Sequence, residues 1–262
     1  MRSEFLLILA VAASAAIASP VGGLIALWRR PTTLFMSVSL GFASGVLLAT
    51  ISFEMLPAAL ELSPLPVAVA GFLVGFAAVY GLDLFINRGK LVGEKAEQHA
   101  GVERFHRRHR PRGDEVTVLA GGTSAEELIE GVSIGVGAAI KPGLGLLVAL
   151  AIVIDNLSEA LSIGELIRDQ HGNERSRPMW RILKWTGLIG LSLFSSVLAG
   201  WFLLRGLPNS VLGFLFAAGA GGMLYLTVTD LLPEAEERHY QQSAALALAA
   251  GFMTIFALGQ FF

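Results

Sequence analysis

The sequence predicts an all-α integral membrane protein with eight transmembrane helices, and three observations lead to this fold class. Of the 262 residues, 54% are hydrophobic and only 15% are charged, whereas soluble domains carry about 25% charged residues. Several apolar stretches reach the roughly 20 residues that cross a bilayer as a helix. The 30 glycines suit close helix packing in lipid, and the lack of cysteine excludes disulfides and thiolate metal sites. A soluble globular protein is therefore excluded.

Turn-forming or charged residues divide the chain into eight apolar segments. The segments are 4–28, 33–57, 66–86, 116–140, 143–167, 183–206, 209–232 and 241–262. The breaks include Arg29-Arg30-Pro31 and Lys141-Pro142-Gly143. The first segment continues to Trp28 and ends at two arginines, which favours a retained span over a cleaved signal peptide. Residues 1–262 are therefore expected to form a single transmembrane domain.

The basic residues predict the orientation in a cell membrane. With the N-terminus outside, sixteen of the 19 lysines and arginines face the cytoplasm, and only Arg2, Lys141 and Arg205 face outward. This asymmetry follows the positive-inside rule and places both termini outside.

The longest connection, 87–115, is expected to be a cytoplasmic, disordered loop because it is polar and poor in apolar residues. Its His99, His106 and His109 stand among eight lysines and arginines. Those charges would repel a cation, which favours a loop that sets topology over one that senses metal.

The second and seventh segments share a pattern that predicts an inverted repeat. The stretch from Gly45 to Pro57 aligns without gaps on the stretch from Gly221 to Pro233, and an acid precedes the proline by three residues in both copies. Because five spans separate the copies, they cross the membrane in opposite directions. Spans 1–3 and 6–8 would then flank spans 4 and 5, as in many secondary transporters, unless the similarity is due to chance. Glu54 is then expected near the external face and Asp230 near the cytoplasmic face.

The fourth and fifth spans carry acids near the middle of the membrane. Glu126 and Glu130 stand at i and i+4, as do Asp155 and Glu159, so each pair lies on one helix face. At about 1.5 Å per residue, Glu126 lies about 15 Å into its span. Each central acid costs about 2.5–3.5 kcal/mol, and no lysine, arginine or histidine lies in the middle of any span. Protonation, internal water or bound metal ions must therefore compensate these acids.

The spacing favours metal among these options. Glu127 and Asn156 flank the two acid pairs, so both helices present matching ladders of oxygen ligands. Two such helices face to face would hold one or two divalent cations, and five carboxylates would nearly balance two such ions. The alternative is a network of carboxylates that share protons and only hold the bundle together.

Four stretches together resemble the ZIP (Zrt-, Irt-like protein) family of divalent-metal transporters. These are Glu126-Glu127-Leu128-Ile129-Glu130-Gly131, Asp155-Asn156-Leu157-Ser158-Glu159-Ala160, Gly45-Val46-Leu47-Leu48-Ala49-Thr50 with Leu56-Pro57, and Leu231-Leu232-Pro233-Glu234. The resemblance covers nearly the whole chain. It implies eight spans, external termini, a homodimer, and uptake into the cytoplasm of a divalent metal (zinc, iron, manganese or cadmium) as substrate. We expect no enzymatic activity, no organic cofactor and no nucleic-acid partner.

The resemblance also implies roles for individual residues. Glu130 and Glu159 match the family's bridging glutamates. Glu126 and Asp155 take the other ligand positions of one site, and Glu127 and Asn156 those of a neighbouring site. The remaining two acids match the ends of the pathway, Glu54 at the entrance and Asp230 at the exit.

The sequence departs from the family pattern at three positions. Ile129 and Ser158 replace the signature prolines, so the chain lacks the residues that would kink these helices. An acid, Glu126, replaces the signature histidine, and an all-oxygen cage shifts preference from zinc toward harder ions such as manganese or magnesium.

Other interpretations have less support in the sequence. The stretch Gly122-Thr123-Ser124-Ala125-Glu126-Glu127-Leu128 also resembles a signature of cation/calcium exchangers, which are antiporters. That interpretation requires a second copy of the signature and about ten spans, and the chain has neither. A membrane protein that binds metal without transporting it would need a sensory domain or docking motif. An intramembrane metalloenzyme would need a nucleophile–base pair beside the acids.

Overall fold

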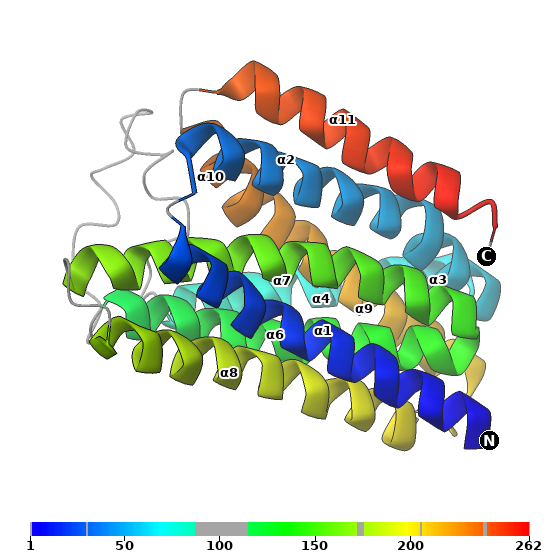
Figure 1. Ribbon diagram of the computed structural model, residues 1–262. Coiled ribbons are helices and arrows are strands. Elements are labelled where there is room, and N and C mark those ends of the chain that lie inside the picture. Colours follow the sequence, from blue (N-terminus) through cyan, green and yellow to red (C-terminus); the bar gives the residue numbers. More distant parts are fainter. Residues whose placement is uncertain are drawn as a thin grey trace.

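The computed structural model describes residues 2–29, 31–86, 115–171, 176–204, 206–237 and 240–261. The predicted cytoplasmic loop, apart from Glu115, lies outside these residues, and so do its three histidines. Within the described ranges every regular element is helical, which confirms the predicted all-α membrane class (Figure 1). The elements are α1 (Arg2–Trp28), α2 (Thr33–Ala49), η1 (Thr50–Met55), α3 (Leu56–Leu62), α4 (Leu65–Ile86), α6 (Glu115–Ile140), α7 (Pro142–His171), α8 (Ser176–Ala199), η2 (Gly200–Leu204), α9 (Asn209–Leu226), η3 (Thr227–Leu231), α10 (Leu232–Glu237) and α11 (Gln241–Leu258).

Seven helical units of the described chain are long and apolar enough to cross a membrane. They are Leu6–Trp28, Thr33–Leu62, Leu65–Phe85, Pro142–Glu165, Met179–Leu204, Asn209–Glu236 and Gln241–Leu258. Helix α6 has 26 residues, which corresponds to roughly 39 Å, but the three glutamates in its middle, Glu126, Glu127 and Glu130, set it apart from the seven. The observed helices follow the predicted segments closely; the second extends to Leu62 rather than residue 57.

The helices form one bundle, and both chain ends lie at the same end of it (Figure 1). Helix α3 is at this same end, and α10 is at the opposite end. The predicted external position of the termini requires them to share one end, and the side of the membrane on which they lie stays a prediction.

Two π-helical segments, η1 and η3, interrupt the units Thr33–Leu62 and Asn209–Glu236 at equivalent places. The amide of Leu56 bonds to the carbonyl of Ile51, and the amide of Leu232 to that of Thr227, so both span five residues. A proline follows in each copy. Its ring lacks an N–H and clashes with the carbonyl four residues earlier, and a wider π turn accommodates this defect. The shared acid–x–Leu–Pro pattern thus encodes the same local structure twice.

Helix pairs of the two halves pack in corresponding ways. Helix α2 packs along α11, and α9 packs along α4. Gly45 of α2 lies against the carbonyl of Leu248, and Gly221 of α9 lies against that of Phe72. The same offset of 176 positions relates residue 45 to 221, residue 72 to 248, and Glu54 to Asp230. Equivalent residues of the two halves therefore make equivalent contacts. These matched contacts support the predicted inverted repeat.

A cluster of fully buried apolar side chains fills the bundle between η1, α6, α7 and α9. Its largest members include Met55, Ile134, Ile152 and Phe216. Met55 lies beside Ser133, and Phe216 lies beside Gly137, one and two turns beyond Glu130 on α6. This cluster therefore packs against the half of α6 that ends at Ile140.

The close contact between α4 and α9 leads to a stability prediction. A Cβ atom on Gly75 would lie 1.8 Å from the carbonyl oxygen of Ala218. Gly75→Ala should therefore force the helices apart and cost about 1–3 kcal/mol, measured as a lower melting temperature in detergent. Gly81→Ala on the same helix is the matched control, because a Cβ there meets nothing within 4 Å. Equal melting temperatures for the two variants would contradict the packing.

Candidate metal centre

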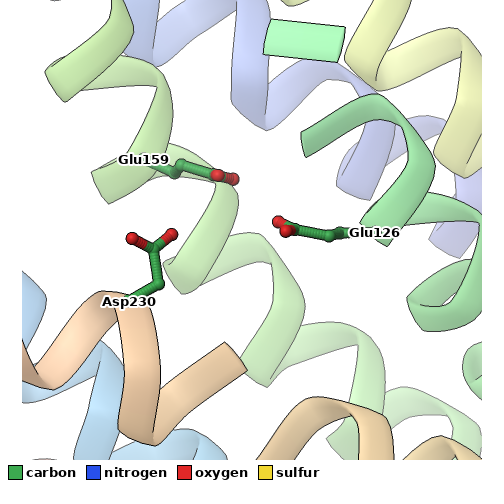
Figure 2. Close-up of side chains that lie close together, drawn as sticks. All are labelled: Glu126, Glu159 and Asp230. Atoms are coloured by element: carbon green, nitrogen blue, oxygen red, sulfur yellow. The ribbon is translucent and has the colours of Figure 1, made fainter. Parts of the chain in front are cut away.

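Three carboxylates from different helical units meet inside the bundle. Glu126 of α6, Glu159 of α7 and Asp230 of η3 point toward one another (Figure 2). One oxygen from each lies within 4.8 Å of the others. All three side chains are half-buried. This group is the cluster of described residues whose ligand atoms are close enough to share one metal ion.

A small cavity surrounds this trio and collects further acids. It offers about 20 Å³ to the centre of a water molecule, which is enough for one water or one bare cation. Seven carboxylates line it, together with Thr123 and three leucines, and none of these described lining residues is basic. The carboxylates are those of Glu126, Glu127, Glu130, Asp155, Glu159, Asp230 and Glu234.

Two hydroxyl groups orient the acids at the rim. Thr123 Oγ1 donates a 2.6 Å hydrogen bond to Glu159 Oε1, and Ser162 Oγ donates a 2.8 Å hydrogen bond to Glu234 Oε1. Thr123 is one turn before Glu126 and Glu127 on α6, so it shares their helix face. These bonds hold the carboxylates of α7 and α10 in fixed directions.

The deeper polar groups lack partners. Glu127, Glu130, Asp155 and Asn156 are at most 5% exposed. Both carboxylate oxygens of Glu127, one of Asp155 and both polar atoms of Asn156 have no hydrogen bond. Glu127 lies beside the Asn156 amide, but no hydrogen bond of normal geometry joins them. An unpaired buried polar group costs about 1–3 kcal/mol. Carboxylate and amide oxygens are the ligands of hard and borderline divalent cations, so such an ion would satisfy them.

The structure brings together most of the residues predicted from the sequence. The predicted acids of α6 and α7 all line the cavity, and Asn156 lies behind it beside Glu127. Asp230, predicted at a separate mouth, lies within the cluster itself. The reason is that Glu126 is in the first half of α6 and Glu159 is in the second half of α7, so both acids lie on the side of the bundle's middle that faces α10.

Glu54 lies away from the cavity. Its side chain is half-buried, and its carboxylate packs against Gly259 at the C-terminal end of α11. Lys141, in the connection between α6 and α7, acts on it electrostatically. Glu54 and Asp230 thus lie toward opposite ends of the bundle, and the pathway role of each stays a prediction.

Sequence reasoning missed several residues near the cavity. Asp83 of α4 accepts a 2.5 Å hydrogen bond from the hydroxyl of Tyr225, and both side chains are buried. Asp83 also acts electrostatically on Glu126 and Asp230. A single acid near the end of an apolar span was the available signal. Thr123 and Glu234 are likewise visible in the sequence but take their roles only from their neighbours in space.

Helices α6 and α7 run without interruption through Ile129 and Ser158, the positions where the family signature has prolines. The structure therefore shows no break in either helix at these two positions. The sixth span contributes a hydroxyl rather than an acid: Ser196 Oγ donates a 3.0 Å hydrogen bond to the carbonyl of Glu127. This bond fastens α8 to α6 at the level of the cluster.

Comparison with known proteins gives a consistent result. Residues 93–259 match the model of the family described as ZIP Zinc transporter. The zinc transporter ZupT of Corynebacterium glutamicum is 31% identical over 255 residues, which cover 93% of this chain and 94% of the relative. ZupT of Salmonella arizonae is 31% identical over 219 residues, covering 80% and 79%. ZupT of Corynebacterium efficiens is 30% identical over 248 residues, covering 90% of each.

The unpartnered carboxylate of Glu127 leads to a second prediction. Glu127→Gln removes one of the crowded acids and keeps the shape of the side chain, so it should relieve repulsion among the carboxylates and raise the melting temperature of metal-free protein by a few degrees. The measurement is thermal unfolding in detergent with a chelator. Glu61→Gln, at an exposed acid of α3, should leave the transition unchanged. An unchanged or lower transition in Glu127→Gln would show that the carboxylate is already compensated.

Proposed function

The chain belongs to the ZIP zinc transporter family, and on this premise we propose that it carries divalent metal cations across the membrane into the cytoplasm. The observation that carries the proposal is the meeting of Glu126, Glu159 and Asp230 in a cavity whose described lining contains no basic residue. The cation is the substrate of the protein, and no organic cofactor or catalytic step is needed.

The size of the trio fits a divalent ion. An ion at the centre of an equilateral triangle with the observed upper limit of 4.8 Å between oxygens would lie about 2.8 Å from each. Calcium-type contacts are about 2.3–2.6 Å and zinc–carboxylate contacts about 2.0–2.2 Å. The three side chains therefore need to move by less than about an ångström to close on an ion.

We assign the ligands in two adjacent groups. Glu126, Glu130, Asp155 and Glu159 hold one ion between α6 and α7, with Asp230 at its cytoplasmic side. Glu127 and Asn156 complete the neighbouring site. The orphaned oxygens of Glu127, Asp155 and Asn156 support this assignment, because they lie beside the cavity without other partners.

Zinc is the first candidate substrate because the relatives compared above are named zinc transporters. The donor set itself is made of oxygen, without imidazole or thiolate, and this predicts that manganese and iron are also accepted. Membership in the ZIP family argues against the cation/calcium-exchanger interpretation. The eight spans, with α6 as the fourth, external termini and a homodimer remain parts of this proposal.

The repeat suggests how the pathway alternates. Leu40 and Leu231 line the cavity beside Asp230. The two halves of the repeat are offset by 176 positions, so Leu40 corresponds to residue 216 and Leu231 to residue 55. Those two residues, Phe216 of α9 and Met55 of η1, are fully buried and pack near the part of α6 that follows Glu130. We propose that the halves exchange conformations, so that Phe216 and Met55 separate and open a path from Glu54 when Leu40 and Leu231 close.

The carboxylate cluster can be tested by transport. Glu159→Gln and Asp230→Asn should each lower zinc uptake into proteoliposomes at least tenfold, because one charged ligand is lost while side-chain shape is kept. Glu61→Gln should transport normally, since Glu61 is exposed at the end of α3. Thermal unfolding of each variant would verify that it remains folded. Undiminished uptake in both cluster variants would refute the ligand assignment.

The proposed exchange can be tested with single cysteines, because the chain has none of its own. Met55→Cys should react with a membrane-impermeant thiol reagent added outside intact cells, and zinc should change the rate. Leu47→Cys is the control. Leu47 is buried like Met55, and its counterpart in the repeat, Met223, is buried as well, so Leu47 should stay buried when the two halves exchange conformations. If both cysteines stay equally unreactive under transport conditions, Met55 does not line an external path.

A further inference from the structure

A buried carboxylate close to the cation cavity has no part in the pathway proposed above. Asp83 lies three residues before the end of α4 and is 5% exposed. It does not line the cavity, yet it acts electrostatically on Glu126 and Asp230. Ionisable residues inside a membrane span are costly and are kept mostly for function. The position of Asp83 therefore needs an explanation of its own.

The hydroxyl of Tyr225 fixes the direction of this carboxylate. It donates a 2.5 Å hydrogen bond to Asp83 Oδ2, and the tyrosine is 3% exposed. Phe76 and Tyr80 of α4 pack edge-on against the Tyr225 ring, with ring centres 5.3 Å and 6.0 Å away. These contacts restrain the phenol beside Asp83. A hydrogen bond donated to a carboxylate also stabilises its charged form.

The apolar residues around Tyr225 form part of the cavity wall. Val79, Tyr225 and Leu226 make a buried cluster, and Ile129 packs against it. Leu226 also lines the cavity, and Ile129 directly precedes the ligand candidate Glu130. A charge next to such a wall acts on the cavity through material of low dielectric constant, which weakens its field much less than water would.

The inverted repeat does not require this hydrogen bond. The counterparts of Asp83 and Tyr225 in the other half are Gly259 and Ala49. Helices α2 and α11 nevertheless pack along each other as α9 and α4 do, with glycines against carbonyls in both pairs. The bond is therefore a feature of the end of the bundle that holds the carboxylate cluster, and the helix packing is achieved without it elsewhere.

We propose that Asp83 strengthens cation binding from outside the cavity, and that Tyr225 is the positioning residue that holds its carboxylate there. Asp83 does not touch the ion, and its negative charge adds to that of the ligand carboxylates through the cavity wall. Residues that support a metal site without binding the ion typically change its affinity by about 10–100-fold. This inference rests on the proposed function, since it assumes that divalent cations enter the cavity.

Equilibrium dialysis of zinc and manganese against the purified full-length protein in detergent provides the test. Asp83→Asn removes the charge but keeps an oxygen that can accept the bond from Tyr225, so it should raise the Kd about tenfold. The factor should be the same for both ions, because a charge that does not touch the ion acts only through charge and distance. Tyr225→Phe should also raise the Kd, and it should add nothing in the Asp83→Asn background.

Tyr80→Phe is the matched control because it removes the hydroxyl of a neighbouring tyrosine that is 43% exposed. It should keep the Kd of the unmodified protein, and an equal loss in Tyr80→Phe and Tyr225→Phe would overturn the role of Tyr225. Thermal unfolding of each variant separates binding from stability. A bond that only fastens α4 to α9 would lower the melting temperature of Tyr225→Phe and leave the Kd of Asp83→Asn unchanged, which would overturn the proposal.

Two further outcomes are decisive. A loss in Asp83→Asn that is much larger for one ion than for the other would overturn the proposal, because Asp83 would then be a ligand. Unmodified protein that binds neither ion would refute the metal-binding function together with this inference. An unchanged Kd in Asp83→Asn, in protein that does bind zinc, refutes this inference alone.

Discussion

The mutual repulsion of carboxylates in a cavity without a basic residue is the constraint on which the rest of the structure depends. Seven acids line about 20 Å³. Two unit charges 4.8 Å apart repel by roughly 3–4 kcal/mol at an effective dielectric constant of 20. Such a group is stable only when protons, water or cations neutralise it and a firm scaffold holds it in place. A cation that enters the cavity therefore relieves the electrostatic repulsion between the carboxylates, and this relief favours its binding.

Small residues supply the scaffold. The contacts of α2 with α11 and of α4 with α9 rest on glycines that touch backbone carbonyls, such as Gly45 on Leu248 and Gly75 on Ala218. On the other side of the cluster, Gly131 of α6 lies against Ser196 and Leu193 of α8. Lipid gives no hydrophobic force between helices, so close van der Waals contact of this kind must hold them together. The acids of α6 are thus fixed from behind by α8.

The backbone of the two halves corresponds more closely than their chemistry does. Asp83 and Tyr225 are hydrogen-bonded to each other near the cluster. In the repeat, Asp83 corresponds to Gly259 and Tyr225 corresponds to Ala49, which cannot form such a bond. Glu234 likewise corresponds to Ala58. One end of the bundle is therefore rich in acids, whereas Lys141 acts electrostatically on Glu54 at the other end. The proposed pathway would thus have the same backbone but a different cation-binding chemistry at each end.

The sequence alone determined the membrane class, the helix limits to within seven residues, and the acids of the fourth and fifth spans. These follow from local physics: apolar length fixes a span, and helical periodicity places Glu126 with Glu130 and Asp155 with Glu159. Only the tertiary structure decided that Asp230 joins Glu126 and Glu159, that Thr123 bonds to Glu159, and that Asp83 lies close by. Such contacts join residues from different helices, and no spacing along the chain encodes the rotation and depth at which those helices pack.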